Sequence, residues 1–137
     1  MKIKLGDDRI QIYVAGPITP QGKVGKHPVI EFLDNVRRGV RWCVRVWQEG
    51  FMPFCAFFDF VYWLVLKDDE EISESMIKNL SMTFVESSKG VFVMPNEKGY
   101  TTWQDSSGVK AEIERAEELK IPVFYTLKAL KKHFKKK

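Results

Sequence analysis

The sequence predicts a single α/β domain in which helices cover both faces of a parallel β-sheet. Short β-branched and aromatic runs alternate four times with helical patterns along the chain. The 137 residues suit one hydrophobic core, and 45% hydrophobic with 29% charged residues is typical of a globular protein. Strands that alternate with helices in this way are joined by right-handed crossovers, which make the sheet parallel.

The four predicted strands are short apolar runs bounded by turn residues. They cover residues 10–15, 51–55, 90–94 and 121–126. The first run, IQIYVA, ends at Gly16 and Pro17, which predicts a buried strand that leads into a loop. Pro53 lies within the second run, and proline cannot donate to a strand ladder, so we expect an edge strand or a strand end there.

The predicted helices have apolar residues at spacings of three and four. They cover residues 29–49, 72–85, 107–120 and 127–137. One face of the first helix is apolar: Val29, Leu33, Val36, Val40, Cys43 and Trp47. The opposite face carries four arginines: Arg37, Arg38, Arg41 and Arg45. We interpret the arginine face as solvated, with contact to a phosphate as the alternative.

Charge and hydropathy narrow the classes of function. The formal net charge is +4, but residues 127–137 hold six lysines and no acid, so the remainder is mildly acidic. We interpret this basic segment as a solvated helix end, with binding of nucleic acid or acidic lipid as the alternative. The longest apolar run, residues 57–66, is interrupted by Asp59 and is too short to span a bilayer. With no signal-peptide pattern at the N-terminus, we expect a cytoplasmic protein without a membrane partner.

The two cysteines, Cys43 and Cys55, show neither the spacing of metal ligands nor a disulfide framework. Cys43 lies in a helical pattern and Cys55 beside a strand, so we expect both to be buried, reduced thiols. No metal and no cofactor is expected.

The candidate site follows from the loops that leave the predicted strands, because open parallel sheets bind ligands at the carboxyl ends of their strands. Residues 95–107 form one such loop, which enters a helix through Ser106, Ser107 and Gly108. A serine there caps the helix, and its free backbone N–H groups also attract anions, so capping and phosphate binding are both open. Glu112 lies four residues beyond Gly108, near the positive end of the helix dipole.

Two segments carry a resemblance to a known family. The first is YVAGPI at residues 13–18, and the second is WQDSSGVKAE at residues 103–112, with the pattern W-x-x-S-x-G-x-x-x-E. Together they resemble the nucleoside 2-deoxyribosyltransferase-like superfamily, and best its uncharacterised phage and bacterial branch. That superfamily also includes the deoxynucleoside 5′-monophosphate N-glycosidases. The resemblance spans residues 10–126.

The resemblance implies a flavodoxin-like or Rossmann-like three-layer fold with a sheet of four to five parallel strands. A fifth strand would lie in residues 57–66, which the pattern also allows as a helix or a pocket-lining loop, or would be absent. Residues 1–126 would then form the domain, and residues 127–137 its basic C-terminal helix or tail. The resemblance also implies a homodimer or higher homo-oligomer in which a neighbouring copy helps to close the site.

For activity, the resemblance implies cleavage or transfer of the N-glycosidic bond of a nucleoside or a nucleoside 5′-monophosphate. Glu112 matches the family's glutamate nucleophile, and Tyr13 matches the tyrosine that orients it. Packing of a buried strand is the alternative role for Tyr13. Ser106 and Gly108 match the positions that hold the 5′ end of the nucleotide.

Other matching positions concern the turn after the first strand and the leaving base. Gly16, with Pro17, matches the tight turn at which the ligand approaches the backbone. Asn79 stands where family enzymes commonly place an aspartate that protonates or hydrogen-bonds the base. A neutral amide is not a general acid at pH 7, so Asp105 and Asp59 are the remaining candidates, and spacing does not choose between them. A non-catalytic nucleotide-binding, sensing or partner-binding module on the same fold is the alternative function.

Overall fold

Four parallel strands form one sheet in the order β2-β1-β3-β4 in this computed structural model, which describes residues 9–134. Their bounds are β1 Gln11–Ala15, β2 Met52–Cys55, β3 Gly90–Val93 and β4 Val123–Phe124. All four predicted strands are present, and Pro53 lies on edge strand β2 as expected. The described residues contain no fifth strand, because residues 57–66 form parts of two short helical segments instead.

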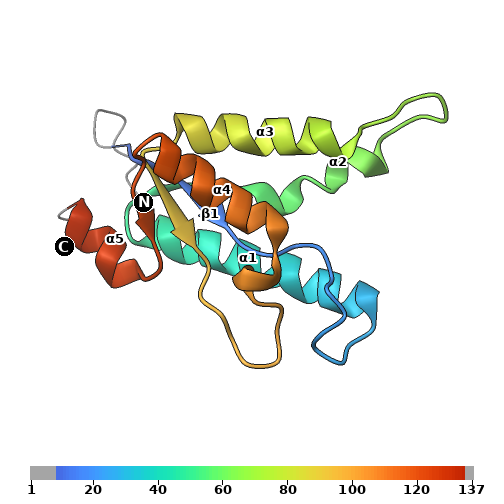
Figure 1. Ribbon diagram of the computed structural model, residues 1–137, viewed down its shortest axis with the longest axis horizontal. Helices are drawn as coiled ribbons and strands as arrows, with labels where there is room; N and C mark the ends of the chain where they lie inside the picture. The colour runs from blue at the N-terminus through green and yellow to red at the C-terminus, as the bar shows by residue number, and fades with distance from the viewer. Residues whose placement is uncertain (1–8, 135–137) are drawn as a thin grey trace.

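The helices cover both faces of this sheet. Their bounds are α1 Pro28–Gln48, α2 Val61–Leu64, α3 Glu74–Ser87, α4 Ser107–Glu118 and α5 Leu127–His133, with single 3-10 turns η1 Ala56–Phe58 and η2 Trp103–Asp105. Helices α1 and α5 pack on one face, and α3 and α4 pack on the other (Figure 1). The protein is therefore a three-layer α/β fold of the Rossmann-like kind. Residues 1–8 and 135–137 of the predicted domain and tail lie outside the described part of the chain.

The alternation of side chains along β1 separates the two halves of the core. Ile12 and Val14 pack with residues of α1 and α5, whereas Tyr13 and Ala15 pack with residues of α3 and α4. All four side chains are buried, as expected for a parallel sheet that is covered on both faces. Tyr13 therefore faces the same layer as α4, the helix that carries Glu112.

The buried face of α1 differs from the apolar stripe in its sequence. Three members of that stripe are more than half exposed: Val29, Leu33 and Trp47. Three polar or charged residues are buried in their place: Glu31, Asn35 and Arg38. The interpretation of Arg38 as part of a solvated face was wrong. Arg38 is 7% exposed, and its guanidinium donates to the carbonyl oxygen of Pro95 at 3.4 Å.

Hydrogen bonds to two loops explain this polar face. The Glu31 carboxylate accepts from the Thr101 hydroxyl at 2.6 Å and from the backbone N–H groups of Gln21 and Gly22 at 2.9 and 3.2 Å. The side-chain amide of Asn35 donates to the same threonine hydroxyl at 3.1 Å. Helix α1 thus holds the loops that follow β1 and β3 through its buried polar side chains, although Asn35 Oδ1 and Arg38 Nε have no hydrogen-bond partner among residues 9–134.

Helix α1 also passes very close to the turn η1. A Cβ added at Gly39 would lie 2.2 Å from the ring of Phe57, so only glycine fits at this crossing. Both residues are buried, and Phe57 joins the core cluster that includes Ile12 and Val14. This contact positions the segment after β2, which contains Asp59, beside the centre of the fold.

Candidate active site

The strand order reverses between β1 and β3, since the chain crosses from β1 outward to β2 and later returns to β3 on the other side of β1. In sheets of this kind, the crevice at the carboxyl ends of the two central strands is the usual position of a ligand. The loops that begin at Gly16 and at Met94 leave the sheet at this crevice. The predicted site residues on α4 follow the second of these loops.

Glu112 and Tyr13 are brought together from α4 and β1. The Tyr13 hydroxyl donates a hydrogen bond to the Glu112 carboxylate, and the Ser81 hydroxyl of α3 donates to the Tyr13 oxygen. Tyr13 is 1% exposed and Glu112 is 8% exposed. The Oε2 atom of Glu112 is buried and has no hydrogen-bond partner among residues 9–134. A buried carboxylate oxygen without a partner is costly, and such atoms are typical of functional sites.

The surroundings of two carboxyl groups raise their pKa values toward neutral pH. Burial raises the pKa of Glu112 to about 7, with a further increase from the charge of Asp59 and an opposing decrease from the Tyr13 hydrogen bond. Burial also raises the pKa of Asp59 to about 6. The pKa of Tyr13 lies well above its ordinary value because of its burial and the neighbouring Glu112. Tyr13 therefore stays protonated as a donor, while both carboxyl groups are suited to exchange protons near pH 7.

Asp105, one of the two alternative acids, has a different environment. One carboxylate oxygen lies 3.0 Å from the Lys23 ammonium, and the other accepts from the Thr102 hydroxyl at 3.1 Å. These hydrogen bonds hold the pKa of Asp105 below its ordinary value. Asp105 is thus an ionised link between the loop after β1 and the start of α4. Asp59, in contrast, interacts electrostatically with both Glu112 and Tyr13.

Asn79 is exposed on α3, and its backbone carbonyl accepts from the Thr83 hydroxyl at 2.8 Å. Ser81, two residues further on, lies on the other side of the helix and contacts Tyr13. The sequence reasoning missed Ser81. One signal was available, because Ser81 precedes the buried Val85 by four residues and therefore shares its face of the helix.

Ser106 caps α4, since its hydroxyl accepts from the Val109 N–H at 3.2 Å. Gly108 is exposed, and a Cβ there would meet only the Ser106 hydroxyl at 3.9 Å. Packing within the chain therefore does not require a glycine at this position. The first N–H groups of a helix have no acceptor within the helix, so the start of α4 presents donors at the crevice.

Gly16 and Pro17 follow β1 directly. A Cβ on Gly16 would come within 2.9 Å of the Phe57 ring and 3.0 Å of the Met94 Cε, so a larger residue would require these side chains to shift. Pro17 is buried. This close packing explains the glycine without a ligand, and it also brings the chain segments after β1, β2 and β3 to one place.

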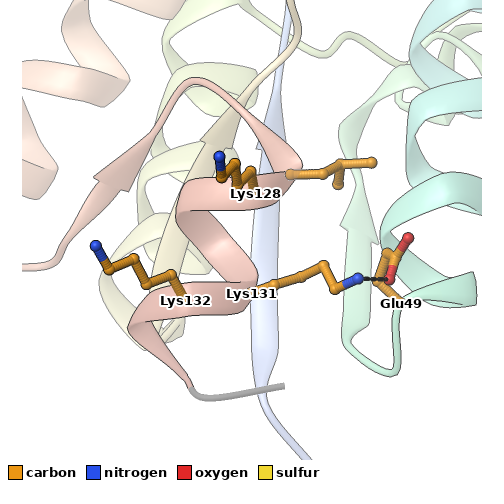
Figure 2. Close-up of a pocket in the computed structure, with 5 residues that line it drawn as sticks. Glu49, Lys128, Lys131 and Lys132 are labelled. Carbon is orange, nitrogen blue, oxygen red and sulfur yellow. Dashed lines mark ion pairs between the residues drawn. The ribbon is translucent and has the colours of Figure 1, made fainter. Parts of the chain in front are cut away.

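Two hollows on the surface do not have Tyr13, Asp59 or Glu112 among their lining residues. The first, of about 470 Å³, lies between the end of α1 and helix α5 (Figure 2). There Lys131 forms an ion pair of 3.0 Å with Glu49, and the amino groups of Lys128 and Lys132 point away from that glutamate. The second, of about 300 Å³, lies between α1 and β2. The candidate active site is defined by its polar contacts.

Within residues 9–134, no three His, Cys, Asp or Glu side chains are grouped as a metal ion would require. None of the helices described is both long enough and apolar enough to cross a membrane.

The fold and this group of side chains define a doubly wound α/β protein with a buried carboxylate beside its topological switch point. No protein-family model matches the chain, and no curated protein matches it either.

Proposed function

We propose that this protein cleaves or transfers the N-glycosidic bond of a nucleoside or a nucleoside 5′-monophosphate, with Glu112 as the nucleophile. The observation that carries the proposal is the state of the Glu112 carboxylate. Tyr13 holds this buried group by a hydrogen bond, while its Oε2 atom has no partner among the described residues. A carboxylate with one oriented and one free oxygen is suited to attack an anomeric carbon.

The reaction has two displacements. The free carboxylate oxygen of Glu112 attacks the anomeric carbon, and the bond to the base breaks with its electron pair on the base. The Tyr13 hydrogen bond fixes the carboxylate in position and favours its charged form before the attack. Water then releases the sugar from the glycosyl-enzyme ester in a hydrolase, whereas a second base does so in a transferase.

Two further groups complete the proposed site. Asp59, whose pKa burial raises to about 6, is the acid that protonates the leaving base. It interacts with Glu112 through space, as the catalytic acid beside a nucleophile would. Ser106 and Gly108 bind the 5′ end of the substrate at the start of α4, where Gly108 leaves room and the helix offers free N–H groups.

The proposal includes a cytoplasmic homodimer or higher homo-oligomer. Large apolar side chains in and directly after α2 are exposed: Val61, Tyr62, Trp63, Leu64 and Val65. Exposed apolar surface of this extent is typical of a protein interface. The two neighbouring cysteines are free, which suits a reducing compartment.

The test is incubation of the full chain with deoxynucleoside 5′-monophosphates and with nucleosides, followed by chromatographic measurement of free base. We expect base release by the wild type and a loss of several orders of magnitude in Glu112→Gln. Glu114→Gln, an exposed substitution on the same helix, is the matched control and should retain activity. Nucleotide binding without base release would favour the non-catalytic alternative. Undiminished release in Glu112→Gln would exclude Glu112 as the nucleophile.

A further inference from the structure

Cys43 and Cys55 form a thiol pair that has no part in the proposed reaction. Cys43 lies on α1, and Cys55 is the last residue of β2, which packs against that helix. The Cys43 thiol donates a hydrogen bond to the Cys55 sulfur, and both residues are free cysteines. Two residues that are 12 positions apart in sequence are thus side by side in the fold.

The pair is accessible from the surface. Both cysteines line the hollow of about 300 Å³ between α1 and β2. Its other walls are apolar: Val40, Val44, Trp47, Met52, Pro53 and Phe58. Cys55 is half-buried, whereas Cys43 is only 5% exposed. A small uncharged oxidant therefore reaches Cys55 first.

The surroundings make the two thiols chemically unequal. Hydrogen bonds from the Cys43 thiol and from the Phe57 backbone N–H lower the pKa of Cys55, against the opposing effects of its burial and of Asp59. The hydrogen bond to Cys55 and burial raise the pKa of Cys43. Because the thiolate is the reactive form of cysteine, Cys55 is the attacking thiol and Cys43 is placed to act second.

We propose that Cys55 and Cys43 are a peroxide-reactive pair that closes reversibly into an intramolecular disulfide. The Cys55 thiolate attacks one oxygen of hydrogen peroxide and breaks the O–O bond. This step leaves a sulfenic acid on Cys55 and a hydroxide, which takes up the proton that Cys55 released. The Cys43 sulfur then attacks the Cys55 sulfur, and the S–O bond breaks as hydroxide leaves with the Cys43 proton as water. Two thiols are oxidised while one peroxide is reduced to two waters.

A disulfide between Cys43 and Cys55 would also constrain residues beyond the pair. Asp59 follows Cys55 by four residues, and the Phe57 ring between them packs against Gly39 of α1 and Gly16 after β1. Joining Cys43 to Cys55 therefore constrains the segment that connects β2 to the centre of the fold.

The experiment treats the reduced full chain with hydrogen peroxide at near-stoichiometric concentration and follows intact mass, free thiols and migration on a non-reducing gel. We expect the wild type to lose both thiols and the mass of two hydrogen atoms, to migrate as a single chain, and to recover on reduction. In Cys43→Ser, the Cys55 sulfenic acid should persist and be trapped by dimedone. In Cys55→Ser, the Cys43 thiol should stay unmodified.

The wild-type measurement alone decides the proposal, so it does not depend on the folding of a variant. Retention of both thiols in the wild type, or a disulfide between two chains in place of one within a chain, would overturn it. Oxidation of Cys55→Ser at the wild-type rate would overturn the assigned order of the two thiols. None of these outcomes depends on glycosidase activity.

Discussion

Glu112 combines burial, a raised pKa and an oxygen without a described partner in one side chain. Each of these features opposes folding when the group is charged, because a desolvated carboxylate with an unmade hydrogen bond is costly. Proteins retain such groups mainly where function requires them. Two predictions follow for Glu112, one on the stability of the protein and one on its activity.

The first concerns the free energy of unfolding of Glu112→Gln. The pKa of Glu112 is about 7 in the folded chain, against an ordinary value of 4.5. Between these values the unfolded chain binds fewer protons than the folded chain, so the wild type loses stability as the pH rises. Glu112→Gln removes the titrating group. The free energy of unfolding of the variant minus that of the wild type should therefore be about 2 kcal/mol more positive at pH 8 than at pH 5.

Urea unfolding at the two pH values measures this difference. Glu114→Gln, an exposed change on the same helix, should show no such dependence. An equal effect of Glu112→Gln at pH 5 and pH 8 would show that Glu112 does not titrate with a raised pKa.

The second prediction concerns the pH dependence of base release. Glu112 must be ionised and Asp59 must be protonated, so kcat/KM should be bell-shaped with a maximum between the two pKa values of about 6 and about 7. Tyr13→Phe removes the hydrogen bond that lowers the pKa of Glu112, and should move the maximum to higher pH. Asp59→Asn removes both the acid and the charge that raises the pKa of Glu112, so base release should be slower and should rise with pH through one midpoint below 7. Profiles of the same shape in all three proteins would contradict the assigned interactions.

At the scale of elements, α1 has the most unusual environment. Its buried Glu31 and Asn35 bind the loop residue Thr101, so the helix serves partly as an anchor for loops at the crevice. The Glu31 carboxylate is buried, which raises its pKa, but the hydrogen bonds from Thr101, Gln21 and Gly22 have the larger effect, and its pKa is lowered. It remains charged and keeps the loops in place.

The contact between α1 and η1 leads to a prediction for Gly39→Ala. The added methyl group would lie 2.2 Å from the Phe57 ring, so the helix and the turn must move apart. We expect a loss of about 1–3 kcal/mol in the free energy of unfolding. Gly108→Ala is the control, since its methyl group would meet only one atom at 3.9 Å. Equal stability of the two variants in urea unfolding would contradict the close packing at Gly39.

For the whole molecule, the exposed apolar residues in and directly after α2 lead to a prediction on assembly. The loop between α2 and α3 extends away from the body of the molecule (Figure 1). Light scattering of the wild type should give at least twice the chain mass of 16.0 kDa. Trp63→Asp and Leu64→Asp should reduce the mass toward one chain, because a charge in an apolar interface is costly. A wild type that stays monomeric at micromolar concentration would contradict the proposed oligomer.

Much of the fold was predictable because local patterns report local structure. The four strands and a serine cap at the start of α4 follow from residues and their near neighbours, whereas the structure decided that the cap is Ser106 and that Pro53 lies on an edge strand. The orientation of α1 was not predictable in this way. Its apolar spacing describes what the helix would bury against an apolar surface. Cys43 and Val46 do pack in the core, but Glu31 and Asn35 in the first half of the helix bury against polar loop groups around Thr101.

Some residues of the candidate site were predictable from the sequence, and others were not. The sequence by itself determined that the chain is a parallel α/β protein and, through the resemblance, singled out Glu112 and Tyr13. Only the tertiary structure decided that Asp59 and Ser81 approach this pair while Asp105 is bound to Lys23. The physical reason is that these contacts join residues that are tens of positions apart. Their meeting depends on how the crossovers pack across the sheet, which no local periodicity records.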